Sequence, residues 1–302
     1  MDVLSDVLRV AQRAETRSAF VTARAPWGVA FDGSLAMSFL VVTEGTAVLH
    51  VDGNATEEVR LMPGDAVLLP DDPPHSLADE PGRPTVDITT VGDTEIGGDG
   101  ARSVLLAGAY VLDLPSLHPL LRGLPEVVHL PAVRGAAPEL HGVIDLLAGE
   151  ISGGHPGTDA AIPRLVDLML LWILRTWFQQ SARNQSWFGA LLDPSLGKAI
   201  ALMHEAPERP WTVEGLAGEA GLSRSAFAQR FVATVGEPPL SYLTAWRMAL
   251  AADLLRTTDL RLAAIAQQVG YDSEFAFAAA FKRVRGQAPG RYRAAQQRET
   301  PG

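Results

Sequence analysis

The chain has 302 residues and carries 25 Lys and Arg against 35 Asp and Glu, so its formal net charge is −10. Its hydrophobic fraction of 47% and its charged fraction of 20% are typical of water-soluble globular proteins. Cysteine is absent, which excludes disulfides, thiolate zinc sites and redox sensing by cysteine. The length is sufficient for two domains, each with its own core.

No targeting signal or membrane span is predicted. The N-terminal stretch MDVLSDVLRVAQRAE carries Asp2 and Asp6 and lacks the basic start and apolar run of a signal peptide. The most hydrophobic run, residues 165–178, is too short to cross a bilayer and contains Asp167 and Arg175. We therefore expect a cytoplasmic protein with no membrane partner.

The N-terminal third changes from helical to β-type patterning. Residues 2–17 predict a short amphipathic helix, with one apolar stripe. From residue 20 to about residue 91 the pattern becomes short β-rich runs, such as MSFLVVTEG, TAVLHVDG and AVLLP. The pairs Asp52-Gly53 and Pro63-Gly64 mark turns between them, and such punctuation predicts an antiparallel barrel or jelly roll. The apolar stripe of the predicted N-terminal helix consists of Val3, Leu4, Val7, Leu8 and Ala11.

One segment of this region, GDAVLLPDDPPHSLAD, resembles the second motif of cupins. Gly64, Pro70 and His75 match its glycine, its proline six residues later and its histidine five residues after that. Asp72 replaces the usual internal glycine, and Asp79 stands where the motif ends in asparagine. The resemblance covers roughly residues 17–129 and implies a cupin-type sensor barrel.

The other cupin motif lacks its metal ligands here. Residues 34–50 contain no histidine pair, Leu40 occupies a place where related sensors often carry histidine, and His50 stands one strand away. One or two histidines do not make a ligand shell, so we expect no metal and no cofactor. The sequence contains no recognisable catalytic motif either, and we expect no enzymatic activity. We expect the barrel to bind a small-molecule effector, with Trp27, Phe39 and His75 as candidate contacts, although core packing explains these residues equally well.

Two helices are predicted after the barrel. A further β-like run, SVLLAGAYVLDL, carries Ala107 where the resemblance implies that relatives commonly have cysteine. Residues 138–151 place Leu140, Val143, Ile144 and Leu147 on one face. Residues 160–180 are apolar almost all round, so that helix must be buried on several sides, within the monomer or against a second protomer. We expect a homodimer through residues 138–180, followed by a short polar linker over residues 181–187.

The C-terminal third contains one sequence unit written twice. LAGEAGLSRSAFAQRFVATVGEPP begins at Leu216, and IAQQVGYDSEFAFAAAFKRVRGQAP begins at Ile265. Each copy predicts a helix-turn-helix, in which a short helix ends at a glycine, a serine caps the next helix, and two phenylalanines at i and i+4 face inward. The aligned pairs are Gly221 and Gly270, Ser223 and Ser273, Phe227 and Phe277, and Phe231 and Phe281.

An amphipathic helix over about residues 240–256 joins the two copies, with Leu243, Trp246, Leu250 and Leu254 on one face. Its length of roughly 25 Å would hold two recognition helices near one DNA turn apart. Together these segments resemble the DNA-binding domain of the AraC/XylS family of bacterial transcription regulators. The resemblance implies binding of double-stranded DNA, contact with RNA polymerase, and activation more often than repression.

The division of charge agrees with a nucleic-acid reader at the C-terminal end. Residues 1–193 contain 12 basic and 25 acidic residues, a net charge of −13. Residues 194–302 contain 13 and 10, a net charge of +3. Because +3 is modest, affinity should depend on where the arginines lie more than on a general basic field.

The residues expected to contact DNA lie on the second helix of each copy. In the first copy Phe227, Phe231 and Ala226 are expected to face inward, and Arg230 is expected to clamp the DNA backbone or form an intramolecular ion pair. The second copy has Ala278-Ala279 where relatives often have Ser-Arg, so we expect it to position the protein more than to read bases, with Arg285 as a further phosphate contact. The candidates are Ser223, Arg224, Ser225, Gln229 and Arg230 in the first copy, and Ser273, Glu274, Lys282 and Arg283 in the second.

The sequence thus predicts an α+β two-domain protein. A cupin/jelly-roll barrel over residues 1–135 precedes a helical dimerisation segment over 136–187, and an all-α double helix-turn-helix domain follows over 188–302. The expected function is a ligand-controlled transcription regulator in the bacterial cytoplasm, at the nucleoid when bound to DNA. Two alternatives stay open: a metal-poor cupin enzyme with an accessory helical domain, and a ligand-independent DNA-binding regulator whose barrel is only a scaffold.

Overall fold

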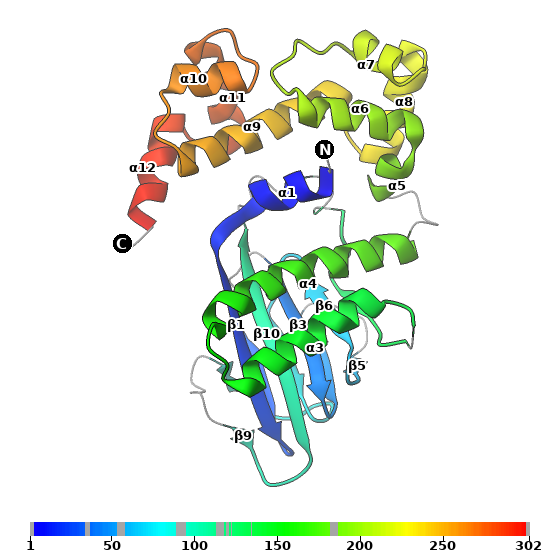
Figure 1. Cartoon of the computed structure of the whole chain (residues 1–302), viewed down its shortest axis with the longest axis vertical. Coiled ribbons are helices and arrows are strands. Elements are labelled where there is room, and N and C mark those ends of the chain that lie inside the picture. Colours follow the sequence, from blue (N-terminus) through cyan, green and yellow to red (C-terminus); the bar gives the residue numbers. More distant parts are fainter. Residues whose placement is uncertain are drawn as a thin grey trace. The chain divides into compact units, whose positions relative to one another are not determined.

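The computed structural model divides the chain into two compact units (Figure 1). The helical unit contains Met1–Gln12, Asp113–Gly123 and Ala182–Gly302, and the barrel unit contains Arg13–Leu112 and Leu124–Ser181. The structure describes residues 3–33, 37–52, 58–88, 95–112, 118, 121, 123–133, 135–181 and 187–299.

Within the described residues the barrel unit consists of two sheets and two helices. One sheet has the strand order β11-β6-β3-β10-β1-β9, and the other has the order β5-β4-β7-β2-β8. The strands of the first sheet are β1 (Gln12–Arg24), β3 (Met37–Glu44), β6 (Ala66–Leu69), β9 (Ile96–Gly97), β10 (Arg102–Leu112) and β11 (Val128–Leu130). Those of the second are β2 (Gly28–Phe31), β4 (Ala47–Val51), β5 (Val59–Leu61), β7 (His75–Ala78) and β8 (Val86–Asp87).

One apolar core lies between the two sheets. β3 pairs antiparallel with both β10 and β6, so that Leu40 lies opposite Ala107 and Val67. Since side chains alternate along a strand, Leu40 and Val42 face this core while Phe39 and Val41 face the other side of the sheet. The core contains buried residues from strands of both sheets, among them Ala23, Val29, Leu49, Leu61, Leu69, Leu77 and Leu105.

The turn before β7 explains one departure from the cupin motif. Asp72, at the position of the motif's internal glycine, has a φ of 43°. Aspartate is one of the few residues other than glycine that adopt this left-handed conformation. Its backbone N–H donates to the carbonyl of Leu69 at 3.2 Å. The turn geometry is therefore kept although the glycine is not.

Two helices cover the outer face of the first sheet (Figure 1): α3 (Pro138–Gly153) and α4 (Thr158–Ser181). The Tyr110 hydroxyl of β10 donates to the carbonyl of Val166 on α4 at 2.6 Å, and the Tyr110 ring lies 5.3 Å from that of Phe39. The predicted inward face of α3 is confirmed, because its four apolar residues are buried. On α4 the buried side consists of Val166, Met169, Leu170, Ile173, Leu174 and Phe178.

The N-terminal helix is shorter than the sequence predicts. It is α1 (Val3–Ala11), and the chain continues from Gln12 as β1 rather than as helix to residue 17. The reason is non-local, because β1 lies between β10 and β9 in the first sheet. Val3, Leu4, Val7 and Leu8 form the predicted apolar stripe and are buried.

The remaining helices belong to the helical unit, where α1 packs on α6 and α9. This packing places residues 1–12 in the helical unit, whereas the sequence predicts a barrel domain over residues 1–135. The helices are α5 (Trp187–Leu192), α6 (Pro194–Glu205), α7 (Val213–Glu219), α8 (Arg224–Val235), α9 (Pro239–Thr257), α10 (Leu262–Gln268), α11 (Glu274–Arg285) and α12 (Pro289–Glu299). No helix within the described ranges is long and apolar enough to cross a membrane.

Candidate DNA interface and effector site

The first helix-turn-helix consists of α7 and α8. Gly221, with a φ of 68°, takes the left-handed conformation that ends α7, and the Ser223 side chain accepts a hydrogen bond from the Ala226 N–H at 3.3 Å. The rings of Phe227 and Phe231 are fully buried, with centroids 5.6 Å apart. The predicted turn, cap and inward aromatic pair are all confirmed.

The second helix-turn-helix, α10 and α11, repeats this geometry. Gly270 has a φ of 80°, and Ser273 accepts from the Ala276 N–H at 3.2 Å. Phe277 and Phe281 are buried with centroids 5.7 Å apart. The duplicated sequence therefore gives a duplicated supersecondary unit.

Helix α9 joins the two motifs, and its Arg247 connects them by side-chain contacts. The Arg247 Nε donates to the carbonyl of Pro207 at 2.7 Å, and Nη2 donates to the carbonyl of Arg209 at 2.8 Å. The same guanidinium lies 5.9 Å from the centre of the Tyr271 ring, beside the turn of the second motif. Burial lowers the pKa of Arg247, although the nearby Tyr271 and Glu208 act in the opposite direction. These contacts connect α9 to the segment between α6 and α7 and to the turn of the second motif.

The outward face of α8 carries hydrogen-bonding groups. Ser223, Arg224, Ser225 and Gln229 are exposed, as the sequence predicts. Ala226 is also exposed, so the expectation that it packs inward is wrong, because the inward face is occupied by the Phe227 and Phe231 rings.

Arg230 forms an ion pair with Asp193. Asp193 is also the N-cap of α6, where it accepts from the backbone N–H groups of Ser195 and Leu196 at 2.9 and 3.1 Å. The intramolecular ion pair predicted for Arg230 is therefore present and holds α8 against the start of α6, while the clamp on the DNA backbone stays a prediction.

The outward face of α11 is different. Ser273, Glu274, Lys282 and Arg283 are exposed as predicted, but so is Phe275. Arg285 is buried and donates to the carbonyl of Met248 on α9 at 3.2 Å, so the prediction that it contacts a phosphate is wrong. Its guanidinium lies 5.8 and 5.6 Å from the rings of Phe281 and Tyr292, which explains why a cation is kept at this buried position.

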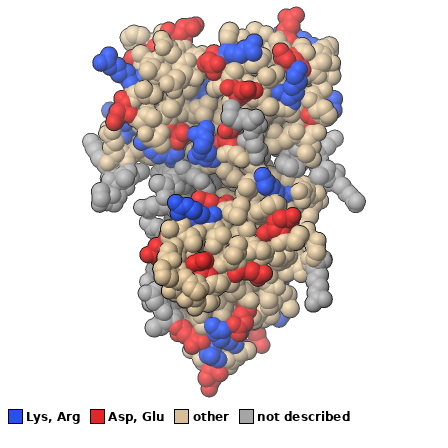
Figure 2. Space-filling view, viewed as in Figure 1, with Lys and Arg blue, Asp and Glu red and all other residues tan. Residues whose placement is uncertain are grey.

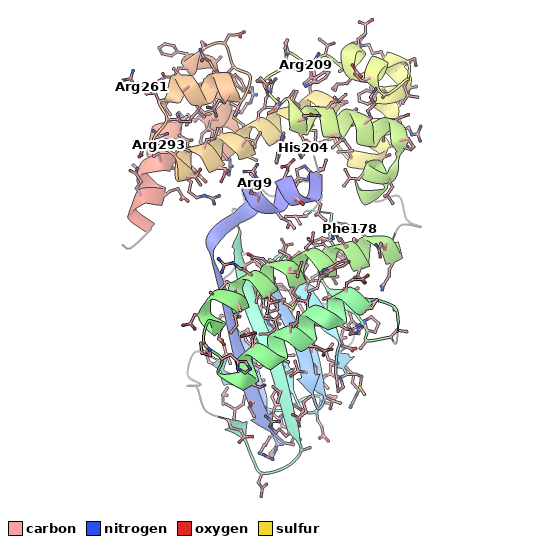
Figure 3. The ribbon with its side chains drawn as sticks, viewed as in Figure 1. Arg9, Phe178, His204, Arg209, Arg261 and Arg293 are labelled. Atoms are coloured by element: carbon pink, nitrogen blue, oxygen red, sulfur yellow. The ribbon has the colours of Figure 1, made fainter. Side chains whose placement is uncertain are left out.

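Basic and acidic side chains are interspersed on the face of the molecule that Figure 2 shows, without a continuous basic field. Some of the cations are also occupied by internal contacts. Arg293 donates to the carbonyls of Leu255 and Leu260 at 3.3 and 2.7 Å, and Arg209 lies over the ring of Trp211 at 4.3 Å (Figure 3). This face therefore offers individual exposed cations rather than one basic patch (Figure 2), and the expectation that DNA affinity depends on where the arginines lie stays a prediction.

A buried polar cluster in the helical unit was not foreseen from the sequence. The Tyr242 hydroxyl on α9 lies 2.7 Å from Nε2 of His118 and 2.6 Å from Nε2 of His204 on α6. A hydroxyl can donate one hydrogen and accept another, so one imidazole accepts and the other donates. The His204 ring also stacks on Trp246 at 4.0 Å, and its Nδ1 lies 3.8 Å from a carboxylate oxygen of Asp6 on α1.

Burial keeps this cluster neutral at Tyr242 and His204. Burial lowers the pKa of His204, and the neighbouring Asp6 carboxylate only partly offsets it. The pKa of Tyr242 is raised well above its usual value, first by burial and then by the negative charges of Glu237 and Asp6. Arg9 and His204, marked in Figure 3, belong to the two helices that meet here, and Arg9 donates to Asp253 of α9 at 3.3 Å. The cluster therefore holds α1 and His118 on the helices that support the first recognition motif.

The three candidate effector contacts do not share one face of the sheet. Phe39 faces α3 and α4 rather than the core between the sheets, on the opposite side of the sheet from Trp27, so its role as an effector contact stays a prediction. The cause is the period of two along β3, where one residue decides the face. Trp27 belongs to the core between the sheets, and His75 stacks on Phe31, which packs against that core, with ring centroids 4.7 Å apart.

Trp27 and His75 each bring one buried nitrogen without a hydrogen-bond partner, Nε1 of Trp27 and Nε2 of His75. His75 Nδ1 is 2.8 Å from the carbonyl of Pro73, which requires the hydrogen on Nδ1 and leaves Nε2 as an acceptor in the neutral ring. The Trp27 indole N–H is a donor. Each of these two nitrogens can therefore form one further hydrogen bond.

A cleft of about 380 Å³ opens beside Trp27. Its wall is fixed by Asp79, which accepts hydrogen bonds from Arg83 Nε and Nη2 at 2.8 and 2.9 Å and from the backbone N–H of Trp27 at 3.2 Å. Burial acts to raise the pKa of Asp79, but these hydrogen bonds hold it below its usual value. The aspartate in place of the motif's asparagine thus pairs with an arginine. The cleft is lined by Pro26, Trp27, Gly28, Arg83, Pro84, Val86, Ile96 and Gly97.

The histidines of the barrel do not converge. Leu40, at the place where histidine is common, lies in the core, and His50 is exposed with Nε2 3.6 Å from Asp52. Among the residues that the structure describes, no three His, Asp or Glu side chains gather around one point that a metal ion could occupy.

Comparisons with known proteins agree with this division into barrel and reader. Residues 2–179 match the family model described as Cupin, and residues 216–295 match the one described as Helix-turn-helix domain. A protein of Streptomyces lividans named as an AraC-like transcription regulator is 37% identical over 299 residues, covering 97% of this chain and 98% of that protein.

Two further relatives carry more specific names. The HTH-type transcriptional regulator AlkR of Acinetobacter baylyi is 30% identical, and the match covers 97% of this chain and 99% of AlkR. The RCS-specific HTH-type transcriptional activator RclR of Escherichia coli is 32% identical, and the match covers 83% of this chain and 82% of RclR.

The buried His75 predicts a loss of stability in mild acid. Burial lowers its pKa from 6.5, although the Pro73 hydrogen bond and the charges of Asp72 and Asp52 oppose the shift. The unfolded chain therefore binds a proton that the folded barrel rejects, and stability falls as the pH drops below about 6.5, with a slope of at most about 1.4 kcal/mol per pH unit.

Thermal unfolding of the full chain between pH 7.5 and 5.5 checks this. His75→Phe keeps a ring against Phe31 and should weaken the acid dependence of the barrel transition. Phe31→Leu is the matched control, because it loosens the same contact and keeps the imidazole. An equal acid slope in the wild type and in His75→Phe would contradict the assignment.

Proposed function

Because this chain belongs to the family of AraC-like transcription regulators, we propose how its parts divide the work. The chain is a DNA-binding regulator, and its two helix-turn-helix motifs are the reading heads. In our proposal α8 and α11 enter successive major grooves on one face of double-stranded DNA, and a small molecule in the barrel controls them. The observation that carries the proposal is the repeated geometry of cap, turn and inward aromatic pair on either side of α9.

The spacing of the motifs suits this arrangement. α9 has 19 residues and is therefore about 28 Å long, close to the roughly 34 Å of one DNA turn. Arg224 can donate two hydrogen bonds to guanine, and Gln229 can pair with adenine. Ser223, Ser225 and Ser273 lie at helix N-termini, where phosphates are also favoured. Lys282 and Arg283 are proposed phosphate contacts, and Glu274 can accept from cytosine.

For the effector we propose a small, mostly apolar molecule in the cleft beside Trp27. The cleft is of a size that holds a small organic ligand, and its wall is largely apolar apart from Arg83, which Asp79 and Glu80 already occupy. Trp27 lines this cleft and is the proposed contact, whereas His75 is not among its lining residues and would be reached only by a ligand that extends into the core between the sheets. Since the chain has no cysteine, the signal does not involve a thiol.

The signal route that we propose runs along the polypeptide chain, from the strands of the barrel unit into two segments of the helical unit. α1 runs directly into β1, and β10 runs directly into residues 113–123, which carry His118. β1 and β10 are neighbours in one sheet, so a ligand that shifts these strands pulls on both segments. Both segments are held on α6 and α9 by the Tyr242 cluster. A ligand that favours one arrangement of the strands therefore biases the first recognition motif.

We further propose that the protein is a homodimer through α3 and α4, the helices within residues 138–180. Leu146 on α3 is 58% exposed and Leu168 on α4 is 39% exposed, although both helices are rich in apolar residues. Trp172 is also only partly buried, and its ring is covered by Arg175 at 5.1 Å. A second protomer would remove this apolar surface from water.

The remaining parts of the proposal follow from the family. Because the named relatives are transcription regulators, we propose that the barrel is a sensor and not an enzyme. Activation through RNA polymerase is the proposed mode, which the name of the activator RclR favours. The site of action is the cytoplasm, at the nucleoid.

The two recognition helices should respond differently to mutation. Arg224→Ala should cost about 1–3 kcal/mol at one base pair and relax specificity there, whereas Lys282→Ala should weaken binding to all sequences alike and lower the salt slope by about 1. Affinities of both variants for a series of single-base operator mutants, measured at several salt concentrations, give the answer. Equal losses across the series for the two variants would contradict the assignment.

The dimer proposal predicts that Leu168→Glu gives a monomer. A carboxylate placed in a desolvated interface opposes association, while on a free surface it costs little. Sedimentation equilibrium of the full chain measures the result. Leu192→Glu, an exposed leucine on α5 outside the proposed interface, is the matched control and should leave the dimer intact. A dimer that survives Leu168→Glu would place the interface elsewhere.

The route through the Tyr242 cluster predicts that Tyr242→Phe loosens α1. The variant leaves two buried imidazole nitrogens without their common partner, which costs about 1–3 kcal/mol and should speed amide hydrogen exchange in residues 3–11 by about tenfold or more. Tyr271→Phe, which removes a hydroxyl from the second motif, is the control. Unchanged exchange of α1 in both variants would mean that the cluster does not hold it.

A further inference from the structure

Phe275 is an aromatic side chain that the fold leaves in solvent. It is the second residue of α11 and is 88% exposed, the highest value among the large hydrophobic residues that the structure describes as exposed. Phe277 and Phe281 of the same helix are fully buried, so the core of the motif is complete without it. A single exposed apolar residue is ordinary on a protein surface. Phe275, however, lies near the N-terminus of the second recognition helix, where a side chain can contact DNA bases.

The duplication shows what Phe275 replaces. With Phe227 aligned on Phe277, Ser225 of α8 corresponds to Phe275 and Gln229 corresponds to Ala279. Two of the four outward hydrogen-bonding positions of the first motif are therefore apolar in the second, while Ser223 and Arg224 correspond to the polar Ser273 and Glu274. Residues 275 and 279 stand at i and i+4, on the same side of α11. Ala279 is exposed as well, so the two form one apolar surface.

The basic residues of α11 extend this side toward its C-terminal end. Arg283 follows Ala279 at i+4 and Lys282 at i+3, and both are exposed. In a helix-turn-helix the N-terminal residues of the recognition helix contact base edges. Phe275 and Ala279 then stand where bases are read, and Lys282 and Arg283 stand where phosphates are held.

From this arrangement we infer that the second motif reads thymine through its 5-methyl group. The major groove presents four kinds of base-pair edge, and the thymine methyl is the apolar feature in it that phenylalanine and alanine contact. Phe275 is the principal contact and Ala279 the second. The inference rests on the proposed entry of α11 into a major groove. It gives this half a larger share of base reading than we expect from the sequence, because that expectation considered polar groups alone.

The test removes the methyl groups one at a time from the DNA. Each thymine of the operator is replaced by deoxyuridine, which lacks only the 5-methyl group, and the affinity of the full chain is measured. One or two positions in the half-site of α11 should lose about fourfold in affinity each, the effect of exposing one buried methyl group. Phe275→Ala should lower the affinity for the thymine site and remove the sensitivity to deoxyuridine at these positions.

Controls separate the possible failures. Ser225→Ala should keep the deoxyuridine effect in the half-site of α11, because it alters only the first motif. Phe275 contributes nothing to the core, so Phe275→Ala should melt like the wild type. Sequence-specific binding without deoxyuridine sensitivity, or with equal sensitivity in Phe275→Ala, would overturn the inference. So would unchanged DNA binding with lost transcription, which would assign Phe275 to a protein partner. Absence of any specific binding would instead contradict the proposed function itself.

Discussion

One buried hydroxyl, that of Tyr242, satisfies two imidazoles that come from positions far apart in the sequence. His204 belongs to α6 beside the first recognition motif, and His118 belongs to a segment that follows β10. Removal of the hydroxyl would take this partner from both Nε2 atoms, which is costly at a buried position. The helical unit therefore contains segments that the family model assigns to the cupin, and it is incomplete without them.

The two segments are continuous in the chain with neighbouring strands of the barrel unit, since α1 leads into β1 and β10 leads into the segment that carries His118. The proposed signal route depends on this continuity. The two reading heads share one core design but differ outside it. α8 presents an arginine, serines and a glutamine, whereas α11 presents a phenylalanine, alanines and two cations. In the proposed arrangement, recognition helix α8 forms hydrogen bonds with base edges, and recognition helix α11 contacts thymine methyl groups and phosphates.

Local patterns foretold much of this fold. Gly221, Gly270, Ser223 and Ser273 take the predicted turn and cap roles, because a cap or a left-handed turn depends on a few neighbouring residues. The cupin strands were recognisable for the same reason. The inward face of α3 also followed from its helical period.

What depends on distant partners could not be read in this way. Residues 12–17 continue a helical pattern yet join a sheet, since strand pairing overrides local preference. Phe39 faces α3 and α4, because a shift of one residue along β3 exchanges the two sides of the sheet. The hydrogen bond of His118 depends on Tyr242, 124 positions later in the chain. The sequence contains phenylalanine at position 275, where the first copy has Ser225, but only the structure shows that this side chain is exposed.

The measurement that tests the central claim most directly is a footprint of the full chain on DNA from upstream of its own gene, repeated over a series of salt concentrations. The account predicts protection in two successive major grooves on one face of the duplex, with affinity that falls steeply as salt rises. The full chain is required, because residues 188–302 alone lack α1 and His118. Equal affinity for unrelated DNA of the same length, without a defined footprint, would contradict it.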